Sequence, residues 1–532
     1  MSVRFERNKL ALNSIRSTDE RLMTKTEVIV IGSGIGGLSA AALLARYGFD
    51  VTVCESHTIP GGAAHAFERG GYCFDSGPSL YSGLSAPSPN PLQQVLEAIG
   101  ETVPCVQYDT WGCWLPEGHF NTAVGADQFC EVLETLRGEK AVQEWRNLQT
   151  LMAPLASAAV ALPPVAVRAD WGIFRTLLPF LPNLLQQGGQ ILQLMGAFDR
   201  LRDRAIQDPF LKNWLDLLCY LLSGLPADGT SAAEMAFMFA DWYRPNVKLD
   251  YPLGGSGAIV NALVRGLEKY GGKLRLGATV TEILLAGKQA RGVRLQTGEE
   301  LHATEAVVSN ASIWDTLKLL PTEQIPEQFR QEKTSIPQCP SFMHLHLGIE
   351  GRDLPADLPC HHIIVNDWDK GVTAEQNVVL VSIPSLLDPE LAPPGKHVIH
   401  AYTPASEPYQ CWTGLDRRSE TYQQQKVERS QVLWEAIARF IPDVRDRAEV
   451  TLIGTPLTHE RFLRRDRGTY GPAINAKTGF FPSANTPWQG LLCCGDSTFP
   501  GIGLPAVAAS GAIAAHTLVP VEKHLQLLKK MS

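Results

Sequence analysis

Apolar residues and glycines near the start of the chain follow a strand–turn–helix–strand pattern. The apolar run Val28–Ile31 predicts a buried strand, and the small apolar residues after it predict a helix that ends near Tyr47-Gly48. A second apolar run, Val51–Val53, predicts the next strand and is closely followed by Glu55. The turn between the first strand and the helix reads Gly32-Ser33-Gly34-Ile35-Gly36-Gly37.

This turn has the spacing of a dinucleotide-binding fingerprint, G-x-G-x-x-G. Gly32 allows a sharp turn, Gly34 lets the backbone approach a pyrophosphate, and Gly37 lets the helix pack closely on the sheet. The phosphates would lie at the positive end of the helix. Glu55, 18 residues after the third glycine and next to Ser56, would accept hydrogen bonds from a ribose. The pattern therefore predicts an adenosine diphosphate ligand.

A second group of cofactor-like elements lies far along the chain. Leu491–Cys494 predicts a buried strand that runs into the turn Gly495-Asp496. After an irregular loop, Ala506–Leu518 predicts a helix of small residues that includes Val507. The positive N-terminus of this helix could stabilise negative charge on a ligand.

The intervening pattern completes an α/β fold with interleaved domains. A helix is predicted after Gly257, strands near 274–276, 280–283 and 306–309, and a hairpin over 291–301. The expected cofactor domain comprises 24–85, 251–310 and 484–520, and the expected substrate domain, of α+β type, comprises 86–250 and 311–483. Residues 1–23 are expected to be a disordered tail, dispensable through residue 22, and 521–532 a C-terminal tail.

Composition excludes several classes of protein. The net charge is −8, the isoelectric point is near 5.9 and no basic cluster stands out, so nucleic acid is not expected as a partner. The eleven cysteines include no C-x-x-C pair, which favours a reducing, intracellular compartment. The first 24 residues lack the apolar core of a secretory signal.

The most apolar part of the chain, about 151–195, has two interpretations. Residues 151–167 carry no charge but include three prolines, which together with their length argues against a membrane-spanning helix. The segment could be ordinary helical core. It could instead form amphipathic helices that dip into a membrane surface and admit a lipid substrate.

Two histidines, His344 and His346, share one face of a predicted strand. Two imidazoles on one face could begin a metal site, but no third ligand is evident nearby in the sequence. We therefore expect sheet packing or a cross-strand pair, and we assign no metal ligand.

Several longer motifs resemble one known family. The chain is similar to the carotenoid isomerase and phytoene desaturase-type flavoproteins, which include the retinol saturases, and most of all to the prolycopene isomerase-like proteins of plants and cyanobacteria. The matching stretches are Phe74–Leu80, Tyr251–Gly257, His459–Arg464, Gly468–Pro472 and Cys494–Gly503. One departure from the amine oxidases is Ala63, which stands where those enzymes typically have an arginine that reaches the cofactor phosphates.

The resemblance implies a Rossmann-type FAD-binding domain of the amine oxidase/phytoene desaturase class. The pair Gly61-Gly62 and Ala63 would pass close to FAD, Val280 would lie against the adenine, and Asp496 would lie near the ribityl hydroxyls. No catalytic residue is assigned, although Asp75, Glu460 and Tyr470 lie in or beside matched stretches.

The implied substrate is an apolar polyene, a carotenoid, and the implied reaction is cis–trans isomerisation with reduced flavin. Desaturation and retinol-saturase-like reduction remain alternatives. So does a non-catalytic polyene carrier, since GDP-dissociation inhibitors of Rab proteins share the architecture without redox chemistry. The implied location is peripheral to a membrane, namely the thylakoid or plasma membrane of a cyanobacterium or plastid.

Overall fold

The computed structural model describes residues 24–85, 88–123, 125, 127–186, 188–243 and 247–531. The predicted disordered tail, 1–23, lies outside the described residues. The segment that we expected to be a C-terminal tail contains helix α20 (Val521–Met531), in which His524 and Leu527 are buried.

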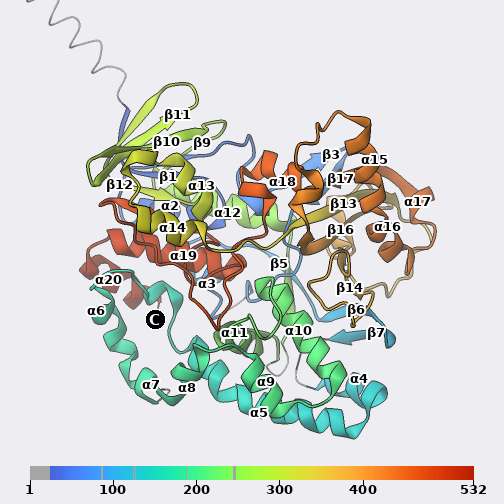
Figure 1. Cartoon of the computed structure of the whole chain (residues 1–532). Helices are drawn as coiled ribbons and strands as arrows, with labels where there is room; N and C mark the ends of the chain where they lie inside the picture. The colour runs from blue at the N-terminus through green and yellow to red at the C-terminus, as the bar shows by residue number, and fades with distance from the viewer. Residues whose placement is uncertain are drawn as a thin grey trace, which may run out of the picture.

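A seven-stranded sheet collects strands from three distant parts of the chain (Figure 1). Its order is β10-β11-β12-β1-β2-β9, and β18 pairs with β12. Strands β9, β2, β1, β12 and β18 are parallel, whereas β10, β11 and β12 form antiparallel pairs. This arrangement confirms the predicted strands and the hairpin. The strands are β1 (Thr24–Ile31), β2 (Val51–Cys54), β9 (Lys273–Arg275), β10 (Val280–Ala286), β11 (Gln289–Leu295), β12 (Glu300–Ser309) and β18 (Leu491–Cys493).

Small residues let three helices pack closely on this sheet. Helix α2 (Ile35–Arg46) is buried along nearly its whole length, between α12 (Gly255–Lys269) and α19 (Leu504–Leu518). A Cβ atom on Gly511 of α19 would lie 2.1 Å from the carbonyl oxygen of Gly36, so only glycine permits this crossing. Helix α3 (Pro91–Ile99) also packs against α19.

A second seven-stranded sheet has the order β17-β13-β16-β15-β14-β6-β7 and lies on the other side of the molecule (Figure 1). Its strands β13 and β16 are antiparallel, with His346 opposite His400. The strands are β6 (Thr110–Leu115), β7 (Gly118–Ala123), β13 (Ser341–Glu350), β14 (His361–Val365), β15 (Val378–Ser382), β16 (Lys396–Glu407) and β17 (Ala448–Gly454). The helices α15 (Glu420–Arg429), α16 (Gln431–Ala438) and α17 (Val444–Arg447) lie beside this sheet.

A helical layer lies below both sheets in Figure 1. Its core contains the buried indoles of Trp145 and Trp214, and Phe129 contacts both rings. The helices are α4 (Gln128–Arg137), α5 (Glu139–Val160), α6 (Ile173–Leu177), α7 (Leu181–Gln186), α8 (Gly188–Leu194), α9 (Asp199–Ala205), α10 (Pro209–Ser223) and α11 (Ala232–Trp242).

Shorter elements connect these layers. They are β3 (Ala66–Arg69) paired with β4 (Tyr72–Asp75), β5 (Cys105–Tyr108) paired with β8 (Leu249–Pro252), α13 (Ile313–Leu319), α14 (Glu327–Thr334) and α18 (Pro456–Leu463). Buried Asp75 at the end of β4 accepts hydrogen bonds from the Ser256 amide (2.8 Å) and the Tyr251 hydroxyl (3.2 Å), which ties β4 to the start of α12.

The apolar segment at about 151–195 begins inside helix α5, which starts well before it. Helix α5 starts at Glu139 and continues through Pro154. Within the described residues, the 28-residue stretch Glu139–Ala166 is long and apolar enough, by length and composition alone, to cross a membrane. Core helices of soluble proteins pass the same test, and α5 packs against α11 through buried residues such as Trp145 and Met152.

Candidate cofactor and substrate site

Two glycine turns from opposite ends of the chain meet at Asn310. A Cβ atom on Gly36 would lie 2.7 Å from Asn310 Oδ1 and 3.0 Å from the Gly495 amide nitrogen and from the Val507 carbonyl oxygen. A Cβ atom on Gly34 would lie 2.8 Å from Asn310 Nδ2. Asn310 directly follows β12, at the carboxyl edge of the parallel strands, where α/β sheets bind dinucleotides.

The second glycine pair lies directly against the first turn. Gly61 forms a β-bridge with Gly34, and its amide donates to the carbonyl oxygen of Ser33 at 3.0 Å. Gly62 begins a short 3₁₀ turn, and a Cβ atom there would lie 3.1 Å from the Gly34 Cα. The pair therefore brings a second stretch of bare backbone beside the first.

Glu55 is held in place by four hydrogen bonds. Its Oε2 accepts from the Ser33 amide (2.8 Å) and hydroxyl (2.7 Å), and its Oε1 accepts from the His57 amide (2.7 Å) and the Ser56 hydroxyl (3.2 Å). A carboxylate offers about four acceptor positions. Ribose hydroxyls would therefore take the places of the two serine hydroxyls, which can rotate away.

A single cavity of about 1560 Å³ contains nearly all of the predicted site residues. Ser33 and Gly37 do not line it: Ser33 turns toward Glu55, and a Cβ atom on Gly37 would lie 2.2 Å from the carbonyl oxygen of Gly32. The predicted residues that line the cavity are Gly32, Gly34, Ile35, Gly36, Glu55, Ser56, Gly61, Gly62, Ala63, Val280, Gly495, Asp496 and Val507. The predicted residues therefore converge in space although they are dispersed in sequence.

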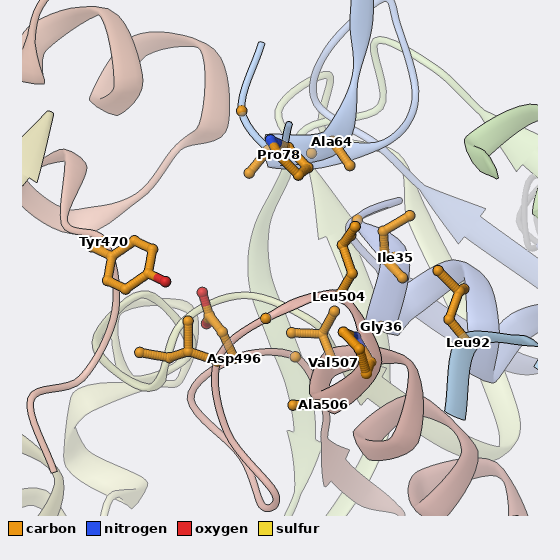
Figure 2. A pocket seen from close by; sticks show the side chains of 18 of the residues that line it. Ile35, Gly36, Ala64, Pro78, Leu92, Tyr470, Asp496, Leu504, Ala506 and Val507 are labelled. Carbon is orange, nitrogen blue, oxygen red and sulfur yellow. The ribbon is translucent and has the colours of Figure 1, made fainter. Parts of the chain in front are cut away.

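Figure 2 shows Asp496 between Tyr470 on one side and Val507 and Gly36 on the other. Asp496 Oδ2 accepts from Arg465 Nη1 at 2.5 Å, and Arg465 Nη2 donates to the carbonyl oxygen of Tyr470 at 3.0 Å. Burial raises the pKa of the Tyr470 phenol, so this group is neutral at physiological pH. Of the three residues near matched motifs, Tyr470 lines the cavity, whereas Asp75 and Glu460 do not.

The rest of the cavity is lined mainly by apolar side chains from the helical layer, from β13 and from the loop before β18. They include Ala158, Leu162, Ile191, Leu194, Leu218, Leu222, Phe237, Met238, Phe342 and Phe481. Pockets for one ligand usually measure about 300–1,000 Å³. A cavity of about 1560 Å³ therefore has room for a dinucleotide and a second, apolar molecule.

Several histidine side chains lie on or beside the wall of the cavity. His344, His346 and His459 line the cavity, and burial lowers the pKa of His346 to about 4 and that of His459 to about 3. These histidines are therefore neutral at physiological pH.

The predicted cross-strand histidine pair is confirmed, because His346 faces His400. His400 is also the third imidazole that the sequence did not reveal. Ring nitrogens of His344, His346 and His400 lie within 4.8 Å of one another, and His344 Nδ1 and His400 Nε2 share a hydrogen bond of 2.7 Å.

The residues present fit FAD. Because Gly34, Gly36 and Gly62 lack Cβ atoms, the three cofactor segments of the chain lie in close contact. The N-termini of α2 and α19 both reach the cavity, where they could bind a pyrophosphate. Glu55 could hold the ribose and Asp496 the ribityl chain. When bound, FAD supplies hydride and electron transfer that no side chain here can perform.

Two residues of the site, Asn310 and Arg465, and one neighbour of the site, His400, were not predicted from the sequence. Asn310 stands after a buried parallel strand, a position that could have identified it. Arg465 lies in a run of arginines that a solvated surface explains equally well. His400 becomes a neighbour of His346 only through strand pairing, which one sequence does not reveal.

Comparisons with known proteins agree with this geometry. Residues 35–519 match the family described as "Flavin containing amine oxidoreductase". A chloroplastic prolycopene isomerase of an Oncidium hybrid cultivar is 35% identical over 504 residues, covering 92% of this chain and 83% of that protein. An all-trans-retinol 13,14-reductase of Danio rerio is 28% identical, covering 89% of this chain and 83% of that protein.

Among solved structures, an oxidoreductase from Methanosarcina mazei superposes with a TM-score of 0.59 at 19% identity, covering 91% of this chain and 98% of that one. This likeness supports the predicted α/β fold. The expectation of FAD as cofactor agrees with the matched family, which is flavin-containing, and the intact site favours an enzyme over a carrier. The chain belongs to the flavin-containing amine oxidoreductase family and is an FAD-dependent enzyme related to the carotenoid isomerases.

Proposed function

We propose that this enzyme isomerises cis double bonds of a carotenoid, with the flavin in its reduced form. The observation that carries the proposal is one continuous cavity, with a dinucleotide cradle at one end and apolar walls at the other. The similarity to prolycopene isomerases supports the same reaction.

The chain's own residues would bind and orient the polyene. A carotenoid has almost no polar group, so the apolar side chains of α5, α8, α10 and α11 would recognise it by shape. The ring centroid of Phe342 lies 5.4 Å from that of Tyr470 and 6.2 Å from that of Tyr402. The three rings form an aromatic wall of the cavity. Neutral phenols and imidazoles there would keep the wall free of charge.

The test is anaerobic incubation of photoreduced enzyme with a poly-cis and, separately, an all-trans carotenoid. We expect the poly-cis substrate to change its retention time in reversed-phase chromatography while its mass stays constant. Gain of two hydrogens on the reduced enzyme would show a saturase, the reaction class named for the retinol reductase relative. Loss of two hydrogens on the oxidised enzyme would show a desaturase, because only oxidised flavin can accept the hydride. Oxidised enzyme is the matched control and should leave the poly-cis substrate unchanged.

We further propose that helices α6 to α8 rest on a membrane surface, in a plastid or a cyanobacterium. Trp171 is 86% exposed, Leu185 73% and Phe174 65%, a concentration of exposed apolar side chains that soluble surfaces seldom carry. Residues of the same segment, Ile191, Leu194 and Met195, line the cavity. A polyene could thus pass from the lipid into the site without crossing water.

Vesicle flotation with liposomes of plastid-type galactolipid tests this proposal. Each large apolar side chain is worth about 1.5–3 kcal/mol when fully buried. The double variant Trp171→Glu/Phe174→Glu should therefore float at least about tenfold less. The control is Val427→Glu, on α15, where the wild-type side chain is 53% exposed. Equal flotation of the double variant and the control would exclude the α6–α8 surface.

A further inference from the structure

We propose that Arg465 supplies the positive charge of the flavin site: its guanidinium binds an anionic group of FAD and at the same time orients Asp496. The inference rests on FAD as the cofactor and not on the reaction proposed above. It gives a role to a residue that no motif assigns.

The site needs a cation because its ligand is anionic and so are several of its walls. FAD carries a pyrophosphate, and reduction of the flavin can add a further negative charge. Glu55 and Asp496 also line the cavity and bring negative charge of their own. Amine oxidases typically place an arginine after the glycine pair, but here that position is Ala63.

Among the described residues that line the cavity, the cationic side chains are Arg69, Lys318, Arg464 and Arg465. Arg69 and Arg464 are exposed to solvent. The Lys318 side chain is 59% exposed and is paired with Asp315 and Asp466. The Arg465 side chain is only 17% exposed, so its charge is the least screened by water.

The guanidinium of Arg465 uses two of its five N–H donors in hydrogen bonds to the described residues. Nη1 donates to Asp496 Oδ2 (2.5 Å) and Nη2 to the carbonyl oxygen of Tyr470 (3.0 Å). Its Nε is buried and has no hydrogen-bond partner among the described residues. Because Nε is covered by protein, the remaining N–H groups on Nη1 and Nη2 are the donors that could bind an anionic group in the cavity. The planar fork of arginine suits phosphate and other oxyanions.

The loop that carries Arg465 is held in an unfavourable backbone conformation. Arg464 and Arg467, on either side, both have a backbone φ of 53°, which residues other than glycine rarely adopt. Asp466 between them is bound by Lys318 and by Gln338 Nε2 (2.7 Å), and its amide donates to Asp315 (3.0 Å). Such strain persists where surrounding contacts enforce it, and it often marks functional sites. Here those contacts direct Arg465 toward Asp496.

The test compares the holoenzymes of Arg465→Gln and Arg465→Lys with wild type. We expect Arg465→Gln to weaken FAD binding roughly tenfold or more, measured by flavin release on dilution, and Arg465→Lys to recover part of the loss because it keeps the charge. The reduction potential, measured by dye equilibration, separates two sources of negative charge. An unchanged potential places the charge partner at the pyrophosphate, and a more negative potential places it at the reduced ring.

Two controls make the outcome decisive. Arg467→Gln removes a charge from the same loop, at a residue whose side chain is 61% exposed, and should leave flavin release and potential unchanged. A double-mutant cycle with Asp496→Asn tests whether Arg465 acts only by orienting Asp496. The proposal is overturned if Arg465→Gln matches Arg467→Gln in both measurements, or if it has no further effect once Asp496 is already Asn.

Discussion

Substitution of Gly36 by alanine should separate folding from cofactor binding, because Gly36 is where the head and tail turns meet. The new Cβ atom would lie 2.7 Å from Asn310 Oδ1 and 3.0 Å from the Gly495 amide nitrogen and the Val507 carbonyl oxygen. Ordinary van der Waals contact begins near 3.4 Å. Two of the three obstructing atoms belong to the backbone, so β18, α19 and α2 would have to move apart.

Overpacking of this kind costs about 1–3 kcal/mol. If the strain falls on the dinucleotide cradle, FAD affinity should drop by about tenfold to a hundredfold. The assay is the flavin-to-protein ratio after gel filtration, together with the FAD dissociation constant from flavin fluorescence. Circular dichroism should show that the variant still folds.

The matched control for this prediction is Gly189→Ala. Gly189 lies exposed in helix α8, and a Cβ atom there meets nothing within 4 Å, so the substitution should leave flavin content unchanged. The reasoning is refuted if Gly36→Ala retains one FAD per chain with an affinity within twofold of wild type.

Two further predictions concern Glu55 and His346. Glu55→Gln replaces a carboxylate that accepts four hydrogen bonds and should weaken FAD binding by about tenfold or more, read from flavin release; unchanged release would exclude Glu55 as the ribose acceptor. Burial lowers the pKa of His346 from 6.5 to about 4, so its contribution to stability is present above pH 6.5 and is lost as pH falls through about 4. Between pH 7.5 and pH 5 this loss amounts to about 2 kcal/mol. Melting temperatures should therefore fall less steeply with acidity in His346→Phe than in wild type, and equal slopes would contradict the assignment.

Local sequence was sufficient for the elements of the cofactor fold. The strand, turn and helix around Gly32–Gly37 are encoded by neighbours in the chain, because Gly32 adopts a φ of 89° and Gly37 avoids a clash with the carbonyl oxygen of Gly32. The same holds for the strand at 491–493 and for the helix that ends at Leu518. Glu55 could be singled out because its distance from the turn follows from the length of one helix and one strand.

Pairing between strands far apart in the sequence determined the positions of the remaining residues in and beside the site. Asn310 contacts both glycine turns only because β12 lies beside β1 and β18, and His400 reaches His346 only because β16 pairs with β13. Likewise, the Arg465 side chain is only 17% exposed, in a loop that Lys318 ties to α13. An arginine in a charged run has the same pattern whether it faces water or a ligand.

The sequence by itself determined the fingerprint, the strands and helices of the cofactor domain, and the family that the chain resembles. The tertiary structure decided which residues of each apolar segment face the cavity, as in residues 171–195, where exposed Trp171 and cavity-lining Met195 belong to one apolar stretch. The physical reason is that hydrophobicity reports how strongly a side chain avoids water. It does not report whether protein, substrate or lipid will cover that side chain.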